Sequence, residues 1–304
     1  MRFIQHKREA FWFYRFLSIF YDKLVNPLFW TPWMRDQSLQ LGRLDEPDIT
    51  VIDVGSGTGF TTEGIVNYVP GSVVTCVDQS PHQMARAKKK AALSDCTFII
   101  GDAENIPVPT DSFDRYVSAG SIEYWPNPQK GINESYRVIK PGGIALMIGP
   151  LSPKTGFARF MAQTWMLFPT LDEYLSWYKN AGFENISYKF IRPHWYRDSD
   201  GYGVAIVGEK KRPGDSPDTS ADQLPNEQKD KVSLWSTVRM IVRLTIGSLA
   251  GFIFIPIALL GYLWNSFNGQ TDRPEEYRER LNRYQIGVLV LIFAFIIWLV
   301  FRLL

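Results

Sequence analysis

The 304-residue sequence has little cysteine, little histidine and almost no net charge. Its two cysteines, Cys76 and Cys96, each lie inside an apolar, strand-like run, so the sequence indicates neither a disulfide framework nor a cysteine-based zinc site. We predict two buried thiols and no bound metal. The formal net charge is +2 and no run of Lys and Arg exceeds three residues, as in Lys88–Lys90, so nucleic-acid binding is not expected.

Apolar residues concentrate in two long runs near the carboxyl terminus, after a polar, Pro-bearing linker over residues 213–239. The first, over 244–264, is uncharged and is about as long as a helix that crosses a bilayer. The second, over 284–301, is shorter and is bounded by Tyr284 and Arg302, which can reach the membrane interface. We predict a membrane anchor over 240–304 with two transmembrane helices. A buried core hairpin is the alternative, but little sequence remains to cover it.

Basic residues gather before the first predicted span. By the positive-inside rule they favour a large domain that faces the cytosol or the stroma. They are Lys229, Lys231, Arg239 and Arg243.

The amino-terminal segment, residues 1–48, is rich in aromatic residues and has no small-residue cleavage site, so we expect no cleaved signal peptide. Over residues 9–28 the few polar side chains fall three or four positions apart, which predicts a helix with one narrow polar stripe. Such a helix can be a lid over an apolar substrate, a face lying in the membrane interface, or a helix packed on the core.

Residues 49–212 alternate strand-like and helix-like segments, beginning with ITVIDVG and continuing to GGIALMIGP. This pattern predicts a doubly wound α/β domain with a parallel sheet. Two late β runs, ISYKFI and GYGVAIVGEK, follow without a helix between them, which predicts a terminal antiparallel hairpin. A KPGG stretch at 140–143 is typical of a turn entering the fifth strand.

The first predicted strand runs into a glycine-rich turn, VIDVGSGTGF, at residues 51–60. The spacing does not match the dinucleotide pattern, because residue 60 is Phe. Asp78 ends the second strand, where a carboxylate can accept hydrogen bonds from ribose hydroxyls. Asp102 ends the third strand, where it can meet an adenine amino group while the next backbone amide meets the ring.

Because the carboxyl ends of parallel strands share one edge of the sheet, these features converge on one crevice. They predict an S-adenosylmethionine (SAM) site in a class I methyltransferase domain, a Rossmann-like seven-stranded sheet with the terminal hairpin. A structural turn with surface acids and an NAD site are the weaker alternatives. The predicted cofactor-binding residues are Asp53, Gly55, Gly57, Gly59, Asp78, Gln79, Asp102, Ala103 and Ser118.

Several longer stretches carry a resemblance to a known family. They are QHKREAFWFYRFLSI, the glycine turn, DQSPHQMARAK, SIEYWPNP, YRVIKPGG and WMLFP, spread through about residues 4 to 197. Together they resemble the plant-type 2-methyl-6-phytyl-1,4-benzoquinol methyltransferases of plastid envelopes. The resemblance implies C-methylation of a prenylated hydroquinone in tocopherol and plastoquinone synthesis, with SAM as co-substrate, a lipid quinol as substrate and a membrane as partner.

The resemblance also implies a location at a plastid inner envelope, or at a cell or thylakoid membrane in a prokaryotic relative. The family proteins begin with a transit peptide, which we do not find here, and end with one span where this sequence predicts two. A methyltransferase for another membrane lipid, such as a menaquinone-type quinol, a phospholipid or a sterol, and a non-catalytic membrane scaffold are the alternatives.

Candidates for catalysis are few. Carbon methylation needs an electron-rich ring, and a base that takes the phenolic proton makes the ring more nucleophilic. Glu123 and Tyr124 follow the fourth predicted strand, at the rim where a substrate must enter. His194 precedes the last predicted strand. We predict Glu123 as the first candidate.

Overall fold

The computed structural model describes residues 29–154, 156, 159, 167–193, 195–196, 201–220, 259–261, 263–264, 285–291, 293–294 and 298. The predicted helix over 9–28, His194, much of the linker and most of the two predicted spans lie outside the described residues. Among the residues described, no helix combines the length and the hydrophobicity that crossing a membrane requires. The predicted domain boundaries stay predictions.

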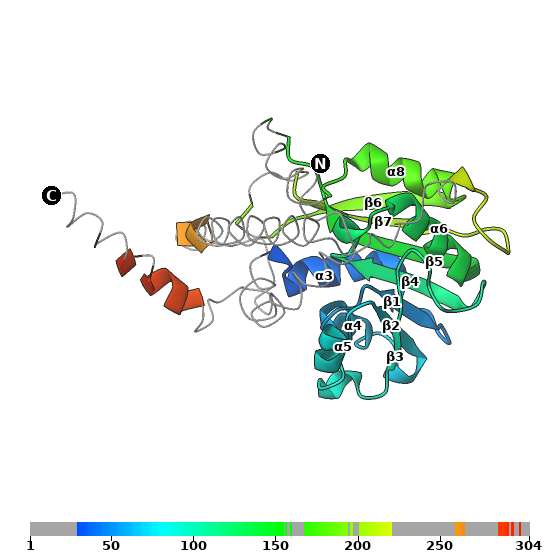
Figure 1. The fold of residues 1–304 in the computed structure, drawn as a ribbon, viewed down its shortest axis with the longest axis horizontal. Coiled ribbons are helices and arrows are strands. Elements are labelled where there is room, and N and C mark those ends of the chain that lie inside the picture. Colours follow the sequence, from blue (N-terminus) through cyan, green and yellow to red (C-terminus); the bar gives the residue numbers. More distant parts are fainter. Residues whose placement is uncertain are drawn as a thin grey trace, which may run out of the picture.

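One mixed sheet organises the described part of the chain, with seven strands in the order β3-β2-β1-β4-β5-β7-β6 (Figure 1). Strands β1 to β5 pair in parallel, whereas β7 runs antiparallel between β5 and β6. The predicted parallel sheet with a terminal hairpin is therefore confirmed. The strands are β1 (Val51–Val54), β2 (Val74–Asp78), β3 (Thr97–Ile100), β4 (Phe113–Ala119), β5 (Ile139–Pro150), β6 (Glu184–Ile191) and β7 (Gly203–Glu209).

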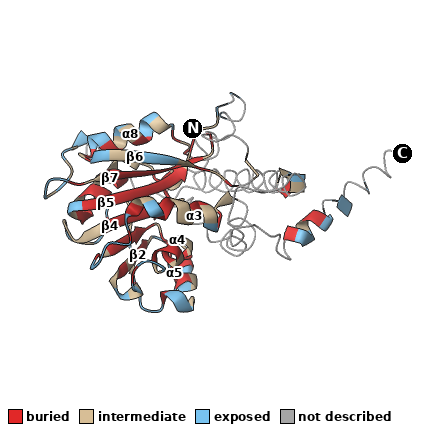
Figure 2. Cartoon of the chain, turned by 180° about the vertical axis from the view of Figure 1, so that it is seen from behind, coloured by how far each residue is buried: buried red, intermediate tan, exposed pale blue. Residues whose placement is uncertain are grey.

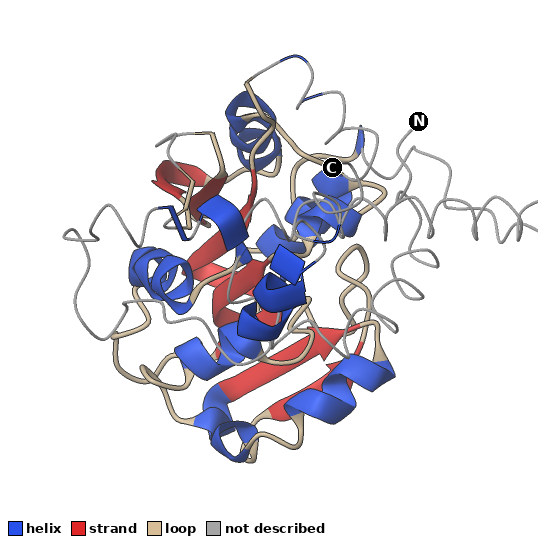
Figure 3. Cartoon of the chain, turned by 90° about the vertical axis from the view of Figure 1, so that its left-hand side faces the viewer, coloured by secondary structure: helices blue, strands red, loops and turns tan. Residues whose placement is uncertain are grey.

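Helices cover both faces of this sheet (Figure 3). Their starts follow from the sequence, because Thr31, Ser80 and Thr170 each accept a hydrogen bond from the first helical turn through the side chain. The described helices with labels are α3 (Pro32–Leu39), α4 (Phe60–Ile65), α5 (Pro81–Ala87), α6 (Pro128–Val138) and α8 (Leu171–Asn180).

Strand β5 shows how the sheet divides the core into two clusters. Ala145 and Met147 pack into the cluster that contains residues of α6 and α8, whereas Leu146 and Ile148 pack into the cluster that contains residues of α3, α4 and α5. Successive side chains of a strand point to opposite faces, so a strand buried on both faces needs apolar residues at every position. Figure 2 shows the result, with β5 and β7 buried and the edge strand β6 partly exposed.

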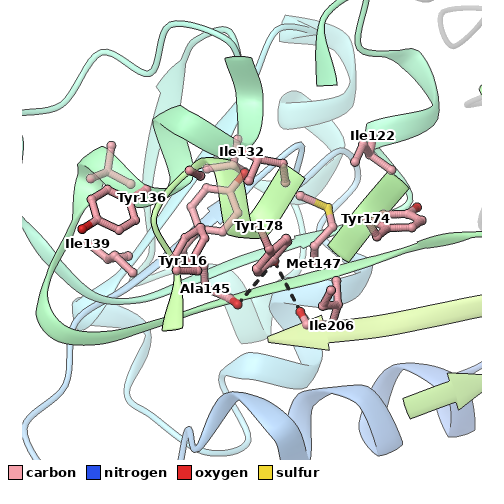
Figure 4. Packing of buried hydrophobic residues seen from close by; sticks show 14 of the residues in the cluster. Tyr116, Ile122, Ile132, Tyr136, Ile139, Ala145, Met147, Tyr174, Tyr178 and Ile206 are labelled. Carbon is pink, nitrogen blue, oxygen red and sulfur yellow. Dashed lines mark hydrogen bonds between the residues drawn. The ribbon is translucent and has the colours of Figure 1, made fainter. Parts of the chain in front are cut away.

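A row of buried tyrosines fixes α8 to the sheet (Figure 4). The Tyr178 hydroxyl donates toward the carbonyl oxygens of Ala145 in β5 and Ile206 in β7, at 3.4 and 3.3 Å. The Tyr174 hydroxyl donates to the carbonyl oxygen of Pro150, at 3.2 Å. Both rings are fully buried, and removing such a ring from a core typically costs about 3 to 5 kcal/mol. Helix α8 therefore holds the residues just before it, 167–170, close to the end of β5.

The KPGG stretch lies within β5 and is not a turn that precedes it. Phe113 pairs with Ile139 and Arg115 with Ile144, so six residues of β5 face three of β4. The four residues from 140 to 143 bulge out at the amino end of the strand, where Gly142 has a φ of +82°.

Candidate active site

A cleft lies over the carboxyl ends of the parallel strands. Its walls come from the segments that follow β1, β2, β3 and β4, together with Trp30 just before α3. Six of the nine predicted cofactor-binding residues line it, and they are Gly55, Gly57, Asp78, Gln79, Asp102 and Ala103.

The glycine turn is packed too closely for side chains. Gly55 has a φ of +74°, and a Cβ placed there would lie 2.5 Å from the Ser121 Cβ, in the segment after β4. The backbone N–H groups of Gly55 and Ser56 donate to the Val77 carbonyl at 2.8 and 3.1 Å, which fastens the turn to β2. Glycine is required at residue 55 because two segments meet there.

Asp78 lines the cleft and is already held in place by two backbone donors. Its carboxylate accepts hydrogen bonds from the N–H of Gly57 at 2.9 Å and from the N–H of Ser80 at 2.7 Å. Burial raises its pKa to about 6, and the two hydrogen bonds oppose that rise. Asp78 is therefore a fixed acceptor that is mostly ionised at neutral pH.

Asp102 and Ala103 lie where β3 ends, on the same cleft. The Asp102 carboxylate accepts a hydrogen bond from the N–H of Glu104 at 3.0 Å, which orients it. Glu104 in turn accepts from the N–H of Asn127 at 2.8 Å, just before α6. Two successive hydrogen bonds thus connect Asp102, after β3, to Asn127 in the segment after β4.

Three predicted residues do not line the cleft. Asp53 lies behind the turn, fully buried, where its carboxylate accepts a hydrogen bond from Thr62 at 2.6 Å. Burial raises its pKa to about 7. Gly59 begins α4, and a Cβ there would lie 2.5 Å from Leu93, so its role is packing. The Ser118 hydroxyl shares a 2.6 Å hydrogen bond with Ser121, which does line the cleft.

The residues behind the glycine turn also include one of the thiols. Cys76 lies in β2, and its sulfur is 3.8 Å from the Thr62 hydroxyl. Cys76 and Cys96 are both buried free thiols, as predicted. Burial raises the pKa of each thiol, so neither is an activated nucleophile.

Aromatic side chains form the other wall of the cleft, and the glycine and acid pattern did not reveal most of them. Trp30, Phe60, Tyr124 and Trp125 all line it. The Arg35 guanidinium lies 4.9 Å from the centre of the Phe60 ring and donates to the Phe60 carbonyl at 3.1 Å. Of the four, only Tyr124 was predicted from the sequence as a site residue. The motif SIEYWPNP contains Trp125, but no pattern identified Trp30.

Glu123 belongs to the short turn Ile122–Tyr124 that follows β4. Its Oε2 atom is buried and has no hydrogen-bond partner among the described residues. Burial raises the pKa of this carboxyl to about 7. Its neighbour Tyr124 lines the cleft, whereas His194 lies outside the described residues. A carboxyl with this pKa can take up a proton and release it near neutral pH.

Comparison with known proteins decides the family. The model of a methyltransferase domain matches residues 52–147. The chain is 50% identical over 269 residues to the chloroplastic 2-methyl-6-phytyl-1,4-hydroquinone methyltransferase of Arabidopsis thaliana, covering 86% of this chain and 78% of that protein. It is 48% identical to the enzyme of the same name from Spinacia oleracea, covering 86% and 76%. The chain belongs to this family.

The 2-methyl-6-phytyl-1,4-hydroquinone methyltransferases are therefore confirmed as the family that the sequence motifs resemble. As a member, the chain is a SAM-dependent C-methyltransferase. Among solved structures, a SAM-dependent methyltransferase from Thermotoga maritima matches with a TM-score of 0.51 at 20% identity, covering 66% of this chain and 99% of that one. This likeness supports the class I methyltransferase fold.

Proposed function

We propose that this methyltransferase transfers a methyl group from SAM to a ring carbon of 2-methyl-6-phytyl-1,4-hydroquinone or its solanesyl counterpart, in tocopherol and plastoquinone synthesis. The observation that carries the proposal is the 50% identity, over 86% of the chain, to a relative that bears this substrate in its name. The cleft supports it, because it joins acidic strand ends to an aromatic wall.

The residues of the cleft fit SAM. Gly55 and Gly57 bring backbone without side chains to the wall of the cleft, and the Ser56 hydroxyl is buried there without a hydrogen-bond partner among the described residues. Asp78 would accept from the ribose hydroxyls, Asp102 from the adenine amino group, and the Ala103 N–H would meet the ring. When bound, SAM supplies an activated, electrophilic methyl group.

Glu123 is the base in this proposal. The ring carbon becomes a better nucleophile when the neighbouring phenolic hydroxyl loses its proton. Methylation would form the bond from ring carbon to methyl as the bond from methyl to sulfur breaks, and the methylated carbon would then lose its own ring proton to solvent. A carboxyl with a pKa of about 7 is matched to that task, since it is partly ionised at neutral pH and still basic enough to accept the proton. Tyr124 and His194 stay predicted candidates for catalysis.

We also propose that residues 240–304 anchor the enzyme in a membrane through spans over 244–264 and 284–301, with the catalytic domain facing the cytosol or stroma. The apolar sequence supports this, and so do the described side chains of the segment. Several large apolar side chains of this segment are between 44% and 70% exposed, namely Leu260, Trp264, Val290 and Leu291. Exposed apolar side chains are more stable against lipid than against water. A prenylated quinol also stays in the bilayer, so an anchor keeps enzyme and substrate together.

The test is transfer of labelled methyl from SAM to a panel of prenylated quinols in liposomes, with the wild type compared to Asp78→Ala. We expect label in 2-methyl-6-phytyl or 2-methyl-6-solanesyl quinol and at least a tenfold loss in the variant. Label only in a demethylmenaquinol, a phospholipid or a sterol would assign the enzyme a different substrate and leave its methyltransferase activity intact. Absence of label together with absence of SAM binding would favour a scaffold.

A further inference from the structure

Besides the Ser56 hydroxyl of the cofactor cleft, two buried polar atoms at the ends of β4 and β5 lack partners among the described residues. One is Oε2 of Glu123, after β4, and the other is Oγ of Ser152, after β5. Strands β4 and β5 are parallel neighbours in which Ala119 pairs with Ile148, so both residues lie at the same edge of the sheet. Buried polar groups in proteins are nearly always hydrogen-bonded, so two such exceptions at one edge of the sheet are candidates for binding a ligand.

Backbone hydrogen bonds join Glu123 and Ser152 to one short segment. The Leu167 N–H donates to the Glu123 carbonyl at 3.2 Å, and the Ser152 N–H donates to the Pro169 carbonyl at 2.8 Å. Leu167 and Pro169 are only two residues apart. They belong to the WMLFP stretch, to which the cofactor site gives no role.

Tyr174 supplies an independent link between the same two strand ends. Its hydroxyl donates to the Pro150 carbonyl, two residues before Ser152. Ile122, the residue before Glu123, belongs to the same core cluster as Tyr174. Because Tyr174 belongs to α8 and α8 follows the 167–169 segment directly, this helix and the segment before it contact the chain around both Glu123 and Ser152.

The turn after β4 separates this pair from the cofactor residues. Ser121, Tyr124 and Trp125 line the cofactor cleft, whereas Glu123 does not. The turn after β4 thus places Tyr124 at the cofactor cleft and the Glu123 carboxylate outside the lining of that cleft.

A 1,4-hydroquinone needs two polar partners, because its two hydroxyls lie on opposite sides of one ring. Resting on the proposed function, we infer that Ser152 binds the second ring hydroxyl, while Glu123 takes the proton of the hydroxyl adjacent to the methylated carbon. Ser152 is then a substrate-binding residue that selects diols over simple phenols. An apolar site would accept diols and simple phenols alike. A site with the buried Ser152 hydroxyl disfavours a simple phenol, because that phenol has no second hydroxyl to pair with Ser152.

The experiment compares two soluble, short-chain acceptors. One is the 1,4-quinol, and the other is the matching phenol that keeps only the hydroxyl adjacent to the attacked carbon. One neutral hydrogen bond corresponds to roughly a 2- to 12-fold change. We expect Ser152→Ala to lower kcat/KM for the quinol by that factor and to leave kcat/KM for the phenol unchanged. Ser152→Thr, which keeps the hydroxyl, should retain the preference for the quinol.

Ser112→Ala is the matched control, because the Ser112 hydroxyl donates to the Pro109 carbonyl just before β4, away from the site. SAM affinity and thermal unfolding are measured for every variant, and Ser152→Cys replaces the alanine variant if that variant is recovered poorly. Equal losses for quinol and phenol would overturn the assignment and leave the proposed function intact. If the wild type binds SAM but methylates neither acceptor, the proposed function fails, and the assignment fails with it.

Discussion

The cofactor side and the proposed substrate side of this active site each contain a buried carboxylate, and the two carboxylates differ in their hydrogen bonding. Asp78 receives two backbone hydrogen bonds and its pKa rises only to about 6. Glu123 has a buried oxygen without a partner among the described residues, and its pKa rises to about 7. Burial disfavours the charge of both groups and raises the two pKa values by similar amounts, from ordinary values of 3.8 and 4.5, so the difference between the two acids lies in which of their oxygen atoms are hydrogen-bonded. One acid is fixed as an acceptor, and the other is ready to exchange a proton.

The largest expected effect comes from removing the proton acceptor. Glu123→Gln should lower kcat by roughly 100-fold or more, the usual range for general acid–base catalysis, and should leave SAM affinity unchanged. In the wild type the single-turnover rate should rise as pH increases through about 7, because Glu123 ionises there. The variant should lose this rise. An unchanged kcat, or a rise that persists in the variant, would contradict the role.

A smaller effect is expected at the glycine turn, where two glycines with positive φ can be compared. Gly55→Ala places a Cβ 2.5 Å from Ser121, whereas Gly142→Ala, at a φ of +82°, meets nothing within 4 Å. Both variants should lose about 1 to 2 kcal/mol of stability from backbone strain. Only Gly55→Ala should also weaken SAM binding, by roughly tenfold or more, because Ser121 must move out of the cleft wall. Titration calorimetry and thermal unfolding separate the two effects, and equal SAM affinities would show that crowding at Gly55 is unimportant.

The smallest effect concerns Asp53, the acid behind the turn. Its folded-state pKa of about 7 exceeds the ordinary value of 3.8, so the folded protein binds a proton that the unfolded chain releases between these values. The contribution of Asp53 to stability therefore falls as pH rises from about 4 to 7, and it stays lost above pH 7. Asp53→Asn should remove that loss.

We expect the melting temperature of Asp53→Asn, relative to wild type, to increase by a few degrees between pH 4 and pH 8. SAM affinity should change less than about threefold, because Asp53 does not line the cleft. A melting difference that is constant with pH would contradict the assigned pKa. A large loss of SAM affinity would place Asp53 with Asp78 on the cofactor side.

The cofactor half of the site could be predicted from sequence because its signals are local. A glycine turn and an acid that directly follow apolar strands share one edge of any parallel sheet, which suffices for Gly55, Asp78 and Asp102. The pattern could not separate Asp53 from Asp78. Both lie at the end of an apolar strand, and only packing decides that one faces Thr62 and the other faces the cleft.

The substrate half depended on contacts between distant segments. Trp30 reaches the cleft from before the first strand, and the backbones of Glu123 and Ser152 both bind the segment 167–169. No periodicity links residues that are 30 to 90 positions apart. The motifs SIEYWPNP and WMLFP marked these regions through resemblance, without showing what their side chains contact.

The sequence by itself determined the fold class, the edge of the sheet that carries the site and the family, since hydrophobic periodicity, turn glycines and contiguous motifs are properties of neighbouring residues. The tertiary structure alone decided which acids line the cleft, which are sealed behind it and how far each pKa moves. Burial and hydrogen bonding set these properties, and both are supplied by segments that meet only in the folded chain.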